Sequence, residues 1–189
     1  MPLEPGDVTP DEDDLNSVRY LIAEMHDDLT GRIQRLRLLA ILLETWPGQA
    51  LFLFGGSATL SAWTEARSSF VYGNYVATIL LCQSLVENLL ASFLHDSLVD
   101  DLPPRIAFKE TLHRCQSRNL VSDQDCRDLE KLMSLRNPLS HFRNLSDDQN
   151  IDRRALDSSL QSNDVLRQDA WFAIGLAVRV LAKPEFQLV

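Results

Sequence analysis

An arginine and a histidine stand close together after a leucine-rich stretch, as Arg136 and His141 with four residues between them. Arginine is a permanent cation whose planar guanidinium binds phosphate or carboxylate oxygens in pairs. Histidine is the side chain whose ordinary pKa lies nearest to neutral, so it can accept or donate a proton. A cation and a proton acceptor at this spacing have the chemistry needed to hold a phosphate and to move a proton beside it.

The residues between this pair predict a break between two helices. Asn137 is a favoured N-cap residue, Pro138 suits the first helical position, and the residue before a proline is disfavoured in helical geometry. His141 would then lie in the first turn of a new helix, where unpaired N–H groups and the positive end of the helix dipole attract phosphate. We expect an anion site at this helix N-terminus, with Arg136 beside it and Arg143 as a second phosphate contact.

A similar spacing joins Arg19 to His26, with six residues between them. These two residues lie within a continuous helical pattern, seven positions apart on one face, and we interpret them as solvent-facing groups. The local sequence therefore distinguishes the two pairs, and only Arg136 and His141 are candidates for chemistry.

A second polar feature interrupts the most apolar stretch of the chain, where Gln83 and Glu87 form an i, i+4 pair. A buried carboxylate needs a partner, and Arg136 is the obvious candidate if the two helices pack together. Such a contact between Glu87 and Arg136 would orient the arginine for catalysis, or it would be a structural salt bridge. Both interpretations remain open at this point.

The segment from Arg136 to His141 resembles the Arg-Asn-x-x-x-His signature of HEPN domains, small all-α bundles found in many toxin and defence ribonucleases. The resemblance covers roughly residues 70–145. An apolar helix containing Val86-Glu87-Asn88-Leu89-Leu90 comes first, a helical pair follows, and the motif comes after a leucine-rich helix. One branch of the family places tyrosine two residues after the histidine, where this chain has Arg143.

The resemblance implies a metal-independent endoribonuclease in which Arg136 and His141 are catalytic and face their counterparts across a homodimer interface. Asn137, Arg143 and Glu87 would bind substrate or support the pair. In such enzymes the histidine assists attack of the ribose 2′-OH on the adjacent phosphate, and the arginine stabilises the developing charge. The resemblance also implies transient contact with RNA, no cofactor, a toxin–antitoxin or phage-defence setting, and an antitoxin or regulatory protein as a further partner.

The same order of helices also resembles mannitol-operon-repressor-like proteins. In that case the chain would be a non-catalytic regulator or scaffold, and the motif would be architectural. The two interpretations differ in what they require of His141. A catalytic His141 is exposed in a groove with Arg136, whereas an architectural one is buried with both ring nitrogens satisfied.

The charge of the chain is distributed unevenly. Its 189 residues include 18 Lys or Arg and 27 Asp or Glu, a formal net charge of −9. Six of the acids lie in residues 1–14, which we predict to be an acidic disordered tail. The remaining 21 acids and 18 cations leave a net of −3, and 15 of the cations are arginine. Net charge therefore does not exclude nucleic acid, and it predicts local, salt-sensitive contact.

The three cysteines form no CxxC pair and leave an odd one over, which makes a disulfide framework unexpected and a reducing cytoplasm the simplest location. His113, Cys115 and Cys126 match no standard zinc spacing, so no metal site is expected. The N-terminus shows no secretory signal pattern. The uncharged stretches at 45–64 and 68–86 contain helix breakers or polar residues, and we predict no membrane span.

Hydrophobic periodicity predicts an all-α bundle of about five to seven helices, in a single domain at residues 15–189. The segment at 74–98 is the most apolar and should occupy the centre, Ser122 and Asp125 predict a capping box, and Thr30-Gly31 is a weak point in the first helical segment. We expect helices at 15–46 (one long helix or two stacked ones), 57–70, 74–98, 106–118, 122–135 and 163–182, with a polar loop at 144–162.

Overall fold

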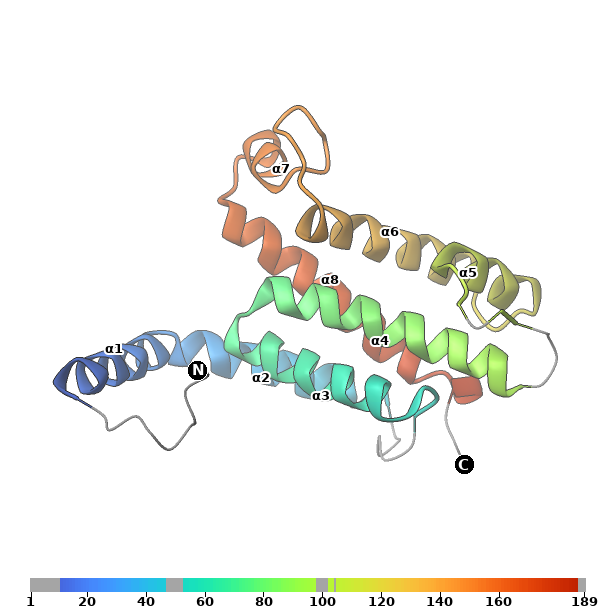
Figure 1. Ribbon diagram of the computed structural model, residues 1–189, viewed down its shortest axis with the longest axis horizontal. Coiled ribbons are helices and arrows are strands. Elements are labelled where there is room, and N and C mark those ends of the chain that lie inside the picture. The colour runs from blue at the N-terminus through green and yellow to red at the C-terminus, as the bar shows by residue number, and fades with distance from the viewer. Residues whose placement is uncertain (1–10, 47–52, 98–101, 104, 187–189) are drawn as a thin grey trace, which may run out of the picture.

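The computed structural model describes residues 11–46, 53–97, 102–103 and 105–186. Helices make up nearly all of the regular structure of these residues, and the described part contains no strand, which confirms the predicted all-α class (Figure 1). The elements are α1 (Glu12–Asp27), α2 (Leu29–Leu43), α3 (Gly56–Tyr72), α4 (Tyr75–Asp96), α5 (Phe108–Ser117), α6 (Asp123–Ser140), α7 (Ile151–Ser158), α8 (Ser162–Leu181) and the short 3₁₀ helix η1 (Pro184–Phe186).

The described residues thus form eight α-helices, slightly more than the predicted five to seven. The first helical segment divides at Asp28, just before the predicted weak point at Thr30-Gly31. The segment predicted as a polar loop contains α7, where the Asn150 side chain accepts the N–H of Arg153 at 3.0 Å and caps the helix. Capping of this kind is a local signal, and it marks the start of α7 in the sequence.

The core is built around α4, which packs against α3, α5, α6 and α8 (Figure 1). The position of α4 at the centre is the one predicted from its composition. It is the one described helix long and apolar enough to cross a bilayer, and contact with four other helices accounts for that composition. Its buried apolar side chains include Ile79, Cys82, Leu85, Val86, Leu89, Leu90 and Leu94.

Contacts of Arg35 hold the turn between α3 and α4 against the N-terminal half of α2. Gly73 ends α3 in the left-handed region at φ 79°, and a Cβ at this position would lie 3.2 Å from Nη2 of Arg35. The buried Arg35 donates from Nε to the carbonyl of Val71 at 2.9 Å and forms an ion pair with Asp28. This arginine therefore joins three helices, and it is not available for a ligand.

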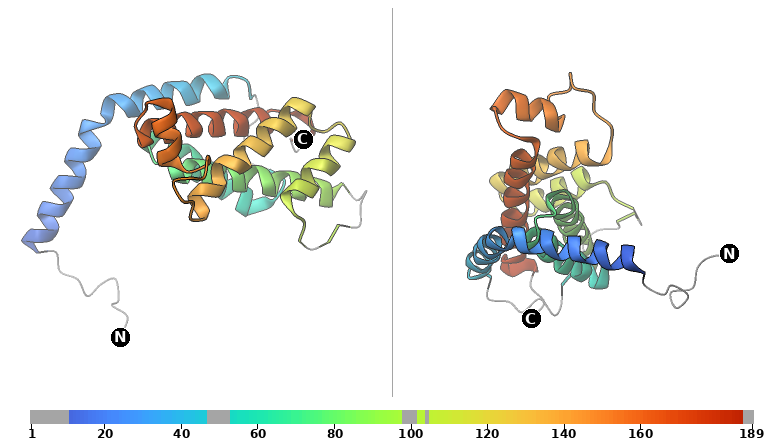
Figure 2. Two further views of the ribbon diagram at one scale, coloured as in Figure 1. Left: turned by 90° about the horizontal axis from the view of Figure 1, so that it is seen from above. Right: turned by 90° about the vertical axis from the view of Figure 1, so that its left-hand side faces the viewer.

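Helix α1 stands apart from the bundle as an arm, and none of its residues is buried (Figure 2). It begins inside the segment predicted to be a tail, because the Asp11 side chain accepts the N–H groups of Asp13 and Asp14 and Asp14 caps in return. Residues 1–10 of the predicted tail lie outside the described residues.

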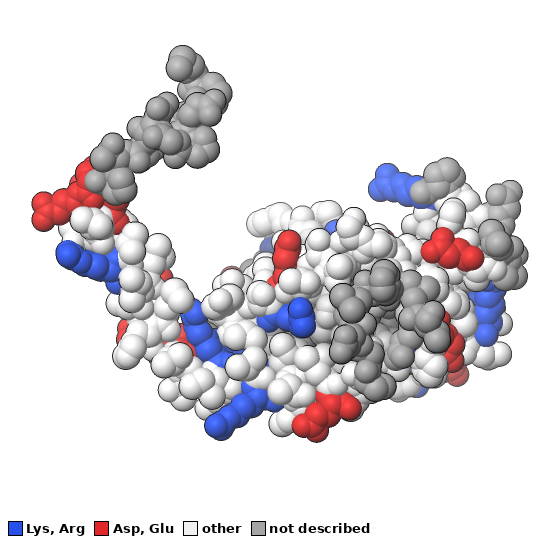
Figure 3. Space-filling model, turned by 90° about the horizontal axis from the view of Figure 1, so that it is seen from below, with Lys and Arg blue, Asp and Glu red and all other residues white. Residues whose placement is uncertain are grey.

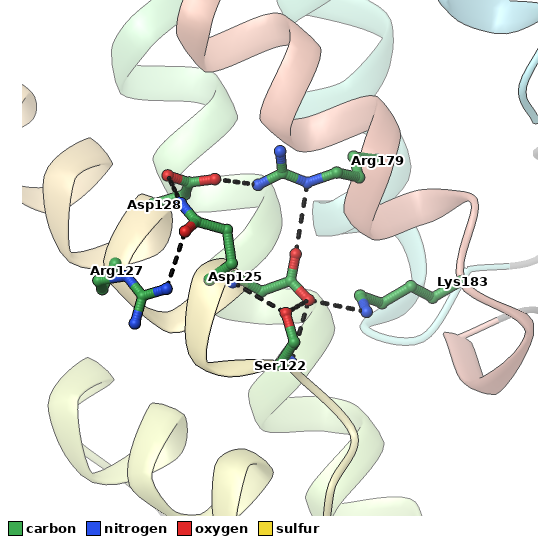
Figure 4. A network of polar contacts seen from close by, with 7 residues as sticks. Ser122, Asp125, Arg127, Asp128, Arg179 and Lys183 are labelled. Carbon is green, nitrogen blue, oxygen red and sulfur yellow. Dashed lines mark hydrogen bonds and ion pairs between the residues drawn. The ribbon is translucent and has the colours of Figure 1, made fainter.

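One polar cluster clamps the start of α6 to the end of α8 (Figure 4). The predicted capping box is confirmed: Ser122 Oγ accepts the Asp125 N–H at 3.1 Å, and the Asp125 carboxylate accepts the Ser122 N–H at 3.0 Å. The same carboxylate lies 2.9 Å from Nζ of Lys183 and 3.3 Å from Nε of Arg179. Burial alone would raise the pKa of Asp125, but the contacts with Lys183 and Ser122 prevail and lower it.

Candidate functional site

The sequence predicts that the helix before the motif ends near Arg136. In the structure, α6 continues to Ser140. Asn137 and Pro138 lie in its last turn. His141 is the C-cap residue in an extended conformation, at φ −136° and ψ 136°, and its N–H donates to the carbonyl of Asn137 at 3.0 Å. The predicted helix break before Pro138 and the predicted N-cap role of Asn137 are therefore wrong.

Packing explains why the helix passes through Pro138. The proline removes the N–H that would otherwise donate to the carbonyl of Ser134, and it disfavours helical geometry at Asn137. On either side of it, Leu135 is buried in the core and Leu139 packs against the core. Burial of two leucines outweighs a local preference, because each contributes on the order of 1.5–3 kcal/mol when fully buried.

The correction changes the electrostatics at His141. A helix C-terminus presents unpaired carbonyl groups and the negative end of the dipole, which attract cations and not phosphate. The anion site predicted at a helix N-terminus is therefore wrong. Arg143, which is predicted to be a second phosphate contact, forms an ion pair with Asp147 at 3.2 Å, and its carbonyl accepts Nδ2 of Asn150 at 2.8 Å. These contacts order the loop after α6.

The packing of α4 against α6 does bring Arg136 and Glu87 to a common space. Together they line a cavity of about 500 Å³, which we call the α4–α6 cavity. Ser84 and Ser140 on its wall are exposed, so the cavity opens to solvent. The residues that line the cavity are Leu80, Gln83, Ser84, Glu87 and Asn88 from α4, and Arg136 and Ser140 from α6.

The expected ion pair between Glu87 and Arg136 does not form, although both side chains line the cavity. Within the part of the chain that the structure describes, Arg136 makes no ion pair or hydrogen bond. It is half-buried, whereas Arg179 on α8 pairs with two carboxylates. Arg136 therefore keeps its donors free for a ligand in the cavity.

Gln83 supplies an unpaired acceptor on the opposite wall. Its side chain is only 5% exposed, and its Nε2 donates to the Glu87 carboxylate at 3.4 Å. Its Oε1 is buried and has no hydrogen-bond partner among the described residues. An unsatisfied buried acceptor costs about 1–3 kcal/mol, so a rotation of the Gln83 side chain that turned Oε1 toward a ligand hydroxyl or amide in the cavity would be favoured.

The sequence prediction did not include three further polar residues of this wall: Ser84, Asn88 and Ser140. Asn88 donates from Nδ2 to the carbonyl of Ser84 at 2.9 Å. A signal for two of them was present, because Ser84 and Asn88 repeat the i, i+4 spacing of Gln83 and Glu87 one position later on an otherwise apolar helix. Two such adjacent pairs indicate a strip of polar side chains along α4 that is not packed entirely within the apolar core.

His141 follows Ser140 directly but is not one of the lining residues. Its side chain is exposed, and neither ring nitrogen has a hydrogen-bond partner among the described residues. The cavity thus offers a cation from Arg136, a carboxylate from Glu87 and an unpaired acceptor from Gln83, and the exposed imidazole of His141 lies outside it, one residue beyond Ser140. This set suits a ligand that carries both an anionic oxygen and a hydroxyl group.

Metal ligation and thiol chemistry find no support in the described residues. These contain no group of three His, Cys, Asp or Glu side chains that could hold a metal ion. Cys82, Cys115 and Cys126 are free and buried. Burial, with a smaller contribution from Cys126, raises the pKa of the Cys115 thiol to about 12, and such a thiol is a poor nucleophile.

No family model, no curated protein and no solved structure matches this chain. The candidate site is therefore defined by its own geometry.

Proposed function

We propose that this chain is a metal-independent endoribonuclease that binds RNA at the α4–α6 cavity and uses Arg136 and His141 as its catalytic pair. The observation that carries the proposal is an arginine without a protein partner in a solvent-open cavity, opposite an unpaired acceptor. The exposure of His141 also favours this function over an architectural role, which requires a buried histidine with both nitrogens satisfied.

The residues of the site have separate roles in the proposed RNA transesterification. Arg136 binds the phosphate oxygens and stabilises their developing charge. Gln83 Oε1 or the Glu87 carboxylate accepts a hydrogen bond from the ribose and orients it. His141 accepts the proton of the 2′-OH as its oxygen attacks phosphorus. The O2′–P bond forms and the P–O5′ bond breaks, O5′ takes up a proton, and the products are a 2′,3′-cyclic phosphate and a 5′-hydroxyl.

A second copy of the chain completes this scheme. In an in-line displacement the attacking and leaving oxygens lie on opposite sides of phosphorus, so one imidazole cannot reach both. Two copies that face each other would supply one His141 as the base and the other as the acid. We propose this homodimer in a cytoplasmic toxin–antitoxin or phage-defence setting, where contact with RNA is transient and an antitoxin or regulatory protein restrains the enzyme.

The test is cleavage of a mixed pool of end-labelled RNA by the purified full-length chain in the presence of EDTA. We expect His141→Ala and Arg136→Ala to reduce the cleavage rate by about a hundredfold or more, the usual size of a general-base or charge-stabilising contribution. The new 3′ ends should resist ligation until an enzyme opens the cyclic phosphate and removes it. This result would identify the 2′,3′-cyclic phosphate product of the transesterification.

His113→Ala is the matched control, because His113 is exposed on α5 and does not line the cavity. This variant should cleave at the parental rate. Equal cleavage by the parent and His141→Ala would contradict the proposal. So would an inactive parent that has been purified under denaturing conditions and refolded to remove any bound inhibitor.

A further inference from the structure

A second cavity adjoins the α4–α6 cavity at Leu80, and we call it the α4–α8 cavity. Its volume is about 440 Å³, and Leu80 lines both cavities. It lies between the first turns of α4 and α8, at the same end of the bundle as the C-terminal end of α6 (Figure 1). The two cavities are therefore adjacent, with one side chain between them, and a single ligand can reach both.

One face of α4 carries both cavities. Four of the lining residues follow steps of four, three and four, which places their side chains on one side of the helix: Val76, Leu80, Gln83 and Glu87. The distance from the first to the last is about 16 Å, at a rise of 1.5 Å per residue. A ligand along this face meets apolar side chains before Leu80 and polar ones after it.

The lining of the α4–α8 cavity differs in charge from that of its neighbour. None of the described residues that line it is charged, and its walls include the apolar side chains of Val76, Ala77 and Leu166. The α4–α6 cavity contains the Arg136 cation and the Glu87 carboxylate. The pair of cavities thus suits a ligand with an uncharged part at one end and with anionic oxygens and hydroxyl groups at the other.

Two asparagines at the starts of helices line the α4–α8 cavity, and neither caps its helix. Asn74 is the N-cap residue of α4, but its side chain accepts no N–H group of the first turn. Asn163 lies in the first turn of α8, which has Gln161 as its N-cap residue. Neither side-chain amide forms a hydrogen bond with a described residue. Each amide therefore keeps one acceptor and two donors free at the cavity.

We infer that the α4–α8 cavity binds the base of the nucleotide whose ribose and phosphate occupy the α4–α6 cavity. A nucleobase is flat and uncharged, and its edge carries donors and acceptors with which an asparagine amide pairs directly. The order along the face fits one nucleotide, with the base at Leu80, the ribose at Gln83 and the phosphate at Arg136. The base is then that of the nucleotide that supplies the attacking 2′-OH. This inference rests on the proposed function and adds base recognition to it.

The charge of the molecule also favours recognition through the base. Proteins that bind single strands without sequence preference follow the backbone with a positively charged groove. On the face of the molecule in Figure 3, by contrast, Lys and Arg side chains are separated by uncharged and acidic ones. The formal net charge of −9 also weakens the attraction of the whole chain for phosphates. We therefore expect contacts with the base to contribute to the affinity for RNA.

The test is the binding of the four nucleoside 3′-monophosphates to the full-length chain by titration calorimetry. These probes contain a base, a ribose and a 3′-phosphate but no bond that the proposed reaction cleaves. Methyl riboside 3-phosphate, which lacks the base, is the reference probe. We expect the preferred nucleotide to bind about tenfold or more tightly than the reference, and we expect the four nucleotides to differ in affinity because the two amides read the edge of the base.

Two variants test the cavity itself. Ala77→Phe places a ring in the α4–α8 cavity and should abolish the advantage of the nucleotides over the base-free probe. Asn163→Ala should reduce the differences among the four nucleotides, and it should keep the fold because Asn163 is exposed. Ala58→Phe and Gln168→Ala are the matched controls, since both residues are exposed and neither lines the cavity. The control variants should bind all the probes as the parent does.

The outcomes separate this inference from the proposed ribonuclease activity. A base-free probe that binds as tightly as every nucleotide overturns the base site, as does a parent that binds none of the probes. A folded Ala77→Phe chain with the parental preference for nucleotides also overturns it. Base-dependent binding by a chain that cleaves no RNA would contradict the ribonuclease and support the base site. Cleavage at the parental rate and sequence preference by Ala77→Phe would overturn the base site alone.

Discussion

At the scale of single residues, the α4–α6 cavity brings an arginine without an ion-pair partner, Arg136, and the unpaired acceptor of Gln83 to one space. Arg154 shows the usual arrangement: two bonds of 2.7 Å to the buried carboxylate of Asp169 raise the pKa of this arginine and join α7 to α8. Arg136 and Gln83 Oε1 have no such partners in the described residues. Buried polar groups in proteins are normally paired, so an unpaired set around a cavity is a mark of a binding site.

Replacement of Gln83 tests whether its unpaired acceptor lowers the free energy of unfolding. Gln83→Met keeps an unbranched side chain of similar length and removes the unpaired acceptor. We expect the free energy of unfolding to rise by about 1 kcal/mol, because the desolvation cost of Oε1 disappears and only a long hydrogen bond to Glu87 is lost. Urea unfolding measures this change, and RNA binding of the same variant should weaken.

A lower free energy of unfolding in Gln83→Met would contradict a destabilising role of Oε1. It would indicate that the Gln83 side chain stabilises the fold through its packing. Ser84→Ala, on the exposed side of the same wall, is the matched control and should change stability by less than about 0.5 kcal/mol.

At the scale of elements, helix ends decide where the candidate residues lie. The C-terminal end of α6 carries Arg136 into the cavity and leaves His141 just outside the helix. The N-terminal end of α6 is fixed to α8 by Asp125, which contacts Lys183 and Arg179 (Figure 4). Because α6 is one continuous helix, the clamp at its start also holds the orientation of Arg136 at its end.

The clamp predicts an acid-sensitive contribution to stability. The pKa of Asp125 in the folded chain lies below the usual value for aspartate, because contacts with Lys183 and Ser122 outweigh its burial. Its contribution is therefore complete above the unfolded pKa and is lost as the pH falls through the folded pKa. We expect Asp125→Asn to lower the free energy of unfolding by about 2 kcal/mol at neutral pH, through loss of both ion pairs, because an amide oxygen can still accept the Ser122 N–H.

The difference between this variant and the parent should shrink below about pH 4 and vanish at lower pH, as measured by urea unfolding across that range. Asp148→Asn is the control, since Asp148 is exposed and has no partner among the described residues. A loss of stability in Asp125→Asn that does not change with pH would contradict the lowered pKa of Asp125.

At the scale of the whole molecule, a single core surrounds α4 and an arm projects from it (Figure 2). The three cysteines come from different helices, α4, α5 and α6, and all lie in this core. Burial raises the pKa of the Cys82 and Cys126 thiols as well as that of Cys115. The bundle therefore shields its thiols from solvent and also holds them in the unreactive protonated form.

Thiol modification should consequently report unfolding of the whole bundle. We expect no reaction with an aromatic disulfide reagent at about pH 8 in the native chain, and reaction of all three thiols in urea. The midpoint should coincide with the loss of helix measured by circular dichroism, because one core gives one cooperative transition. A thiol that reacts under native conditions, or well before the main transition, would contradict a single cooperative core.

Local sequence alone determined the helical class, most of the helix positions and the capping box at Ser122 and Asp125. These features depend on the period of apolar residues and on bonds between neighbours three or four positions apart, which are visible in the chain itself. The polar pair of Gln83 and Glu87 was also recognisable, because these residue types stand out against apolar surroundings.

Only the tertiary structure decided how these residues combine. Pro138 is a local signal for a helix break, but burial of Leu135 and Leu139 against the core carries α6 through it and moves His141 to a helix C-terminus. The α4–α6 cavity and the α4–α8 cavity likewise depend on which helices meet. The preference of proline against a helix interior amounts to about 3 kcal/mol and that of most other residues to about 1 kcal/mol or less, whereas packing between helices sums over many side chains, so contacts between distant segments decide the outcome where the two disagree.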